Sequence, residues 1–118
     1  MKDSANGVDQ WVGRTCEIAL SWRLSGATIG QLFADANPDL TDRQVFLTLA
    51  GEYLASHSRL IEAWQQYSWD KRVGSGPYLD HLEVGRYEDG RQEVHIYADA
   101  TSACADFIYR EASAVLGG

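Results

Sequence analysis

At 118 residues, with 45% apolar and 23% charged side chains, the chain has the size and composition of one globular domain rather than of a disordered segment. Its formal net charge of −7 argues against nucleic-acid binding, because phosphate contacts need clustered lysine and arginine. The start, MKDSANGVDQ, has no signal-peptide core, and no window approaches the roughly 18 apolar residues of a membrane span. We therefore expect a cytoplasmic protein without membrane contact, with a flexible tail over residues 1–10 and one domain over 11–118.

The two cysteines, Cys16 and Cys104, are far apart in the sequence. They form no CxxC pair and lack the cysteine–histidine spacing of a zinc site. Patterns for phosphate loops, nucleophile elbows and dinucleotide sites are also missing. We expect two reduced, buried thiols, no metal and no other cofactor.

Alternating apolar residues predict a first β-strand over residues 14–24. In VGRTCEIALSWRLSG the apolar residues fall mostly at every second position, and on a helical wheel they scatter around the axis. This set is Val12, Cys16, Ile18, Leu20, Trp22 and Leu24. We expect the strand to join a later hairpin in one sheet, because a lone hairpin is only marginally stable in water.

Two helices are predicted next. The first is short and should end at Asn37, because the residue before Pro38 disfavours the α conformation. The second should begin at Thr41 or Asp42, where Thr41 and Gln44 have the spacing of a capping box, and should end near Tyr67. Its apolar stripe contains Phe46, Leu49, Ala50, Tyr53, Leu54, Leu60, Ile61 and Trp64. His57 falls in the middle of this stripe, so we expect it to be buried and hydrogen-bonded.

The segment PYLDHLEVGRYEDGRQEVHIYA, residues 77–98, predicts a hairpin with strands over 78–87 and 91–98. A two-residue turn at Asp89-Gly90 would pair Val84 with His95 and leave both faces mixed. A three-residue loop over 88–90 instead pairs Tyr87 with Arg91, Val84 with Val94 and Leu82 with Ile96. We prefer this register because it gathers the aliphatic residues on one buried face. That face contains Leu82, Val84, Val94, Ile96 and Ala98, and the exposed face contains His81, Glu83, Tyr87, Arg91, Glu93, His95 and Tyr97.

A closing helix is predicted over DATSACADFIYREASAVLGG, with Asp99 and Thr101 as cap candidates. The elements together predict an α+β fold in the order β-α-α-β-β-α. A three-stranded antiparallel sheet would carry the long helix and the C-terminal helix on one face. Leu60 and Phe107 are expected in the core between them.

The exposed hairpin face suggests two kinds of chemistry. In the preferred register His81, Glu83 and His95 lie close together, so a small enzyme could use them as metal ligands or acid–base groups. However, histidine and glutamate are also ordinary neighbours on the solvated face of an antiparallel sheet, and spacing identifies no third firm ligand. We therefore favour a partner-binding face, with no catalytic residue and no metal.

Charge and aromatic residues indicate the kind of partner. Residues 78–118 carry eight acids and three bases, a net charge of −5, so an acidic field is concentrated at the hairpin and the last helix. The three aromatic residues of the run WQQYSW cannot all lie on the one helix face that packs against the core, so at least one is expected to be exposed. Exposed aromatic residues are common at interface hot spots. The partner-binding residues that we expect are Trp69, His81, Glu83, Tyr87, Asp89, Glu93, His95 and Tyr97.

In size and charge the chain resembles the small acidic cytoplasmic inhibitors that neutralise basic bacterial toxins, often nucleases. This resemblance implies an immunity-type protein that covers the active site of a basic protein partner. Two alternatives stay open: the small enzyme that uses His81, Glu83 and His95, and a non-catalytic subunit of a larger complex.

Overall fold

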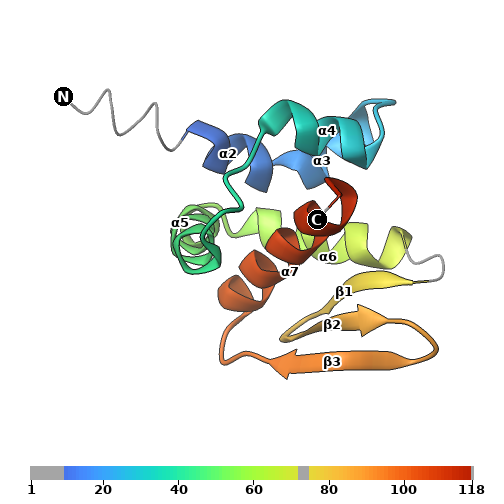
Figure 1. Ribbon diagram of the computed structural model, residues 1–118. Coiled ribbons are helices and arrows are strands. Elements are labelled where there is room, and N and C mark those ends of the chain that lie inside the picture. Colours follow the sequence, from blue (N-terminus) through green and yellow to red (C-terminus); the bar gives the residue numbers. More distant parts are fainter. Residues whose placement is uncertain (1–9, 72–74, 118) are drawn as a thin grey trace.

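Helices fill one side of the molecule and a small antiparallel sheet the other (Figure 1). The computed structural model describes residues 10–71 and 75–117. Most of the predicted tail, residues 1–9, lies outside this range, as do residues 72–74 and 118. No helix in the described ranges has the length and apolar character needed to cross a bilayer.

The predicted strand over residues 14–24 is wrong, because the chain forms helices α2 (Gln10–Cys16) and α3 (Ile18–Leu24) there. Buried residues Val12, Thr15, Cys16 and Ala19 recur at the spacing of three and four positions that marks a helix face. In the predicted strand, Thr15 and Ala19 fall on the face opposite the alternating apolar residues, so the helical stripe was not recognised. The α+β class and the three-stranded antiparallel sheet are confirmed, but the order β-α-α-β-β-α is not: helices come first.

The short helix is confirmed as α4 (Ile29–Ala36), which ends at Asn37 in the left-handed conformation. The predicted long helix is divided into α5 (Arg43–Ser56) and α6 (Arg59–Asp70). Asp42 caps α5 by accepting a hydrogen bond from the backbone N–H of Val45 at 3.2 Å. His57 ends α5 and is exposed, so its predicted burial is wrong: the helix that would have turned it inward stops there.

The sheet has the order β1 (Gly76–Asp80), β2 (Glu83–Tyr87) and β3 (Arg91–Ile96). The strand predicted over residues 78–87 folds back on itself at His81 and Leu82, which join β1 to β2. The third strand therefore comes from within the predicted hairpin and not from the N-terminus. His81 has a φ of 60°, a left-handed conformation that this tight turn requires.

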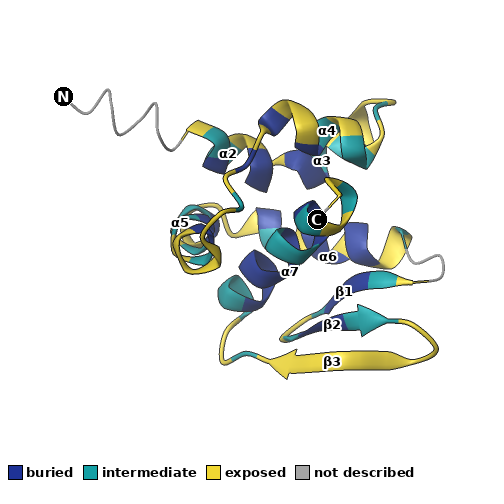
Figure 2. Cartoon of the chain, in the orientation of Figure 1, coloured by how far each residue is buried: buried dark blue, intermediate teal, exposed yellow. Residues whose placement is uncertain are grey.

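The core lies between the helices and strands β1 and β2. Helix α7 (Ala100–Val115) crosses its centre, and Leu60 and Phe107 are buried there as predicted. Trp64 and Tyr67 are also buried, and Trp64 packs edge-on against Phe107 at 6.0 Å. Both cysteines are buried and free, as expected. Strand β3 lies farthest from the helices, and every one of its residues is exposed (Figure 2).

Candidate functional site

Strands β2 and β3 change their register at a β-bulge. Next to the loop Tyr87 pairs with Arg91, as predicted. Farther along, Val84 pairs with His95, so the predicted pairs Val84–Val94 and Leu82–Ile96 are wrong. The extra residue is taken up at Glu93, which has a φ of 53°. The hairpin thus has the preferred three-residue loop. Beyond the bulge, however, it has the pairing of Val84 with His95 that belongs to the rejected two-residue turn.

The bulge exchanges the two faces of β3. Ile96 lies on the outer face opposite Glu83, while His95 lies on the helix side opposite Val84. Of the five aliphatic residues predicted to be buried, Val84 alone is; Leu82 is 39%, Val94 47% and Ile96 66% exposed, and Ala98 is exposed as well. Helices α6 and α7 cover β1 and β2 but not β3, so burial did not select the register there (Figure 2).

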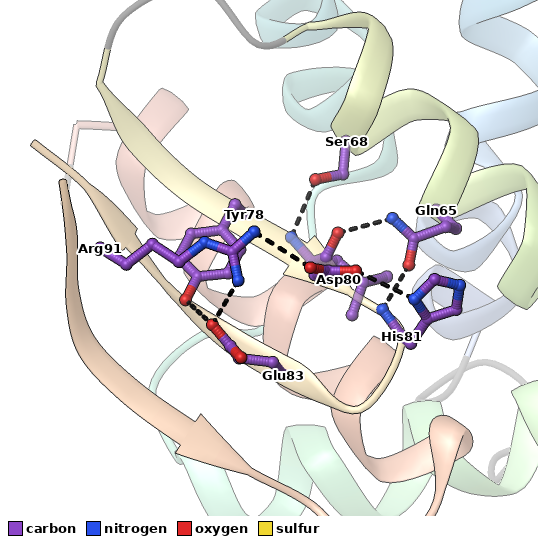
Figure 3. Close-up of polar contacts among 8 residues, drawn as sticks. Gln65, Ser68, Tyr78, Asp80, His81, Glu83 and Arg91 are labelled. Carbon is purple, nitrogen blue, oxygen red and sulfur yellow. Dashed lines mark hydrogen bonds and ion pairs between the residues drawn. The ribbon is translucent and has the colours of Figure 1, made fainter.

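On the outer face, Arg91 holds the three strands together (Figure 3). Its guanidinium donates to Asp80 of β1 at 3.0 Å and to Glu83 of β2 at 2.8 Å. It also lies over the ring of Tyr78, 4.8 Å from the centroid, and the Tyr78 hydroxyl donates to Glu83 at 2.5 Å. Glu83 and Tyr87 are on this face as predicted, and the charge of Glu83 is neutralised there.

These contacts shift two pKa values. Burial opposes ionisation of Asp80, but hydrogen bonds from Arg91 and His81 outweigh it and lower the pKa of the carboxyl. Burial, followed by the hydrogen bond to Glu83, raises the pKa of Tyr78 to about 12. Tyr78 can lie here because residue 85 is glycine: a Cβ would be 2.9 Å from the Tyr78 ring and 2.8 Å from the Gln92 carbonyl oxygen.

The β1 edge of the sheet is closed by two side chains of α6 (Figure 3). The hydroxyl of Ser68 accepts the backbone N–H of Leu79 at 2.8 Å. The amide of Gln65 donates to the Leu79 carbonyl at 2.6 Å and accepts the N–H of His81 at 2.6 Å. Gln65 therefore makes the two hydrogen bonds that a neighbouring strand would make.

Four other predicted site residues are accessible. His81 is exposed in the β1–β2 turn, where its Nδ1 is 2.9 Å from Asp80 and its ring is 5.9 Å from that of Trp69. Trp69 is 42% exposed, and it lines a hollow together with Leu82. Asp89 is exposed in the β2–β3 loop, and Glu93 is exposed in the bulge.

The last two predicted site residues, His95 and Tyr97, face the helices. Their rings are 4.4 Å apart and line a groove beside α5 and α7. The Tyr97 hydroxyl donates at 2.5 Å to Asp106, which is fully buried and also accepts from Arg43 at 3.0 Å and Arg110 at 3.2 Å. The sequence reasoning missed this network, although an aspartate beside Phe107 in a buried stripe needs charged partners.

His81, Glu83 and His95 do not form one site. They lie in a turn, on the outer face and on the helix face respectively, so no point is close to all three. Within residues 10–71 and 75–117, no group of three histidine, cysteine, aspartate or glutamate residues could hold a metal ion. Comparison with known protein families, curated proteins and solved structures finds no match.

Proposed function

We propose that the protein is an acidic binding domain that captures a basic protein partner through the β2–β3 hairpin. One observation carries the proposal: β3 is exposed over its whole length, although it bears the aliphatic residues Val94 and Ile96 (Figure 2). Apolar side chains gathered on an exposed strand and surrounded by charge are typical of a protein interface. Trp69, on helix α6 beside the β1 edge of the sheet, is a further exposed aromatic side chain of the kind found in hot spots.

The acidic residues of the β2–β3 hairpin indicate that the partner's surface is basic. Glu83 is paired with Arg91, and Glu88 is paired with Arg86. Asp89 and Glu93 have no cationic partner among the described residues, so their charge is available to a partner. With a chain net charge of −7, the resulting field steers a basic surface toward the hairpin and raises its association rate.

The particular form of this function that we propose is inhibition of a basic enzyme, such as a bacterial toxin or nuclease, in the cytoplasm. An active site that binds phosphates is lined with lysine and arginine, and an acidic surface with aromatic anchors is complementary to it. Such an inhibitor needs no catalytic residue of its own. A non-catalytic subunit of a larger complex would use the same surface, and the identity of the partner separates the two.

The test is capture of the partner from a lysate of the native host at low and at raised salt, followed by kinetics with the purified partner. We expect a basic protein whose association slows as salt rises, because salt screens the charges. Asp89→Lys/Glu93→Lys should slow association strongly. Asp35→Lys/Glu52→Lys changes the net charge equally at exposed helix positions and should slow it much less. An acidic partner, or equal effects of both variants, would contradict the proposal.

A further inference from the structure

The two edges of the sheet differ in a way that bears on how a partner binds. In the order β1-β2-β3, the edges are β1 and β3. Gln65 and Ser68 close the β1 edge with three hydrogen bonds to its backbone. On the β3 edge, no strand or helix of the described residues covers the backbone (Figure 1). The sheet therefore has one edge at which a further strand can pair.

The hydrogen-bonding groups at this open edge can be assigned from the ladder. The backbone N–H of Tyr97 donates to the Leu82 carbonyl at 2.9 Å, so Tyr97 turns its N–H toward the β1–β2 turn and β2. Neighbouring residues in an antiparallel strand point their backbone groups to opposite sides. The N–H and C=O of Ile96 therefore point outward, beside a side chain that is 66% exposed.

We propose that an extended segment of the partner adds to β3 as a fourth strand, antiparallel or parallel. This inference rests on the proposed function, since the segment belongs to the basic partner. The segment would carry aliphatic residues at alternate positions to pack on Val94 and Ile96, because side chains on one face of a sheet contact across strands. It would carry lysine or arginine to reach Glu93 and Asp89.

Charge and shape argue against a second copy of this chain as the occupant. Two chains of net charge −7 repel each other, and pairing of two β3 strands would bring the exposed Glu93 of each near the other edge. The bulge at Glu93 also interrupts the edge, and such bulges protect natural sheets from unspecific pairing. A segment with cations placed at the bulge offsets the charge of Glu93, whereas the Arg91 of a second β3 is already bound to Asp80 and Glu83 of its own chain.

The test uses a short synthetic peptide of alternating lysine and valine, observed by NMR at low salt. Two further peptides have the same sequence but carry N-methyl groups on every second backbone amide, one peptide on the odd-numbered residues and the other on the even-numbered residues. Each therefore loses the hydrogen-bond donors along one edge of its strand and keeps its charge. We expect the unmethylated peptide and one methylated copy to bind and to slow hydrogen exchange of the Ile96 amide, and the other copy to fail. Ile96→Pro should bind about fivefold to tenfold more weakly than Ile96→Ala, since it also lacks the outward N–H.

Each other result overturns strand addition. Equal binding of all three peptides, or equal binding by the two Ile96 variants, would show that charge alone holds the peptide, and the proposed function would survive. Failure of every peptide, with a basic partner still captured in a salt-dependent way, would place the contact elsewhere on the protein. A dimer with a protected Ile96 amide in the protein alone would assign the edge to a second copy. Far-UV circular dichroism of both variants checks that they fold.

Discussion

The hydroxyl of Tyr97, just beyond β3, donates a hydrogen bond of 2.5 Å to Asp106 on α7. Asp106 is fully buried, and its charge is balanced by Arg43 from α5 and Arg110 one turn along α7. This carboxylate joins two helices to the end of the outermost strand. It thereby positions α7 relative to the exposed hairpin.

Asp106→Ala should destabilise the protein by about 1–3 kcal/mol, because it removes the shared acceptor of a tyrosine and of two partly exposed arginines. This is a measurable part of a typical total stability of about 5–15 kcal/mol. Asp35→Ala is the control, since Asp35 is exposed and, among the residues that the structure describes, accepts a hydrogen bond only from Gln31, at 3.0 Å within the same helix. Urea denaturation measures both variants, and similar midpoints would show that the network is not stabilising.

Gln65→Ala should cost about 1–3 kcal/mol, since it leaves the buried Leu79 carbonyl and the partly buried His81 N–H without their partner. Gln66→Ala, the next residue on α6, removes only an exposed contact to Asp70 at 3.1 Å and should cost about 0.2–0.5 kcal/mol. Hydrogen exchange should also become faster at the His81 amide in Gln65→Ala alone. Unchanged exchange at His81 would contradict the closure of this edge.

Gly85→Ala should destabilise the sheet by about 1–3 kcal/mol, because its Cβ would be 2.8 Å from the backbone oxygen of Gln92. Gly30→Ala is the matched control: Gly30 lies inside α4 with nothing within 4 Å of its Cβ position. Alanine should stabilise that helix by about 0.5–1 kcal/mol. Thermal melts of the two variants should therefore move in opposite directions, and movement in the same direction would be evidence against a close approach at Gly85.

Stability should fall as the pH rises from about 10, the usual pKa of tyrosine, toward 12. The pKa of Tyr78 is raised to about 12 in the folded protein, so in this window the folded state binds more protons than the unfolded state, and the free energy of unfolding decreases. Tyr78→Phe should make this decrease smaller. Denaturation series at several alkaline pH values measure the slope, which would be the same in both proteins if the Tyr78 pKa were not raised.

Local signals in the sequence predicted much of the fold. Pro38 marked the end of α4, and the Glu88-Asp89-Gly90 loop gave the pairing of Tyr87 with Arg91. The start of α5 was predicted at Thr41 or Asp42, and the cap is Asp42 rather than the Thr41 of the expected capping box. Each of these depends on residues that are close in the chain, where turn and cap chemistry acts directly. The closing helix was predicted for the same reason: Asp99 caps it by accepting the N–H of Ser102 at 2.8 Å.

Features that depend on distant residues were not predictable. The register beyond the bulge was wrong because it assumed that Val94 and Ile96 are buried, and nothing in the local sequence shows that the helices do not reach β3. Glu93 gave no signal either, since a glycine is the usual mark of a left-handed bulge residue. The exposure of the candidate residues was partly predicted: Trp69, His81, Asp89 and Glu93 are exposed, whereas Glu83 and Tyr87 are half-buried. The closure of β1 by Gln65 arises from tertiary packing alone.

The bulge at Glu93 also affects which one-residue insertions and deletions the sheet can tolerate. A one-residue deletion within a strand normally turns every later side chain to the opposite face. Here the extra residue is already accommodated, with Arg86 paired to Gln92 on one side of it and Val84 to His95 on the other. Loss of Glu93 would leave one residue opposite Gly85 and a regular ladder, with Ile96 and Tyr97 still on their present faces. The edge strand can thus exist in two lengths with the same surface beyond the bulge, so natural insertions and deletions should be tolerated at this position more readily than elsewhere in the sheet.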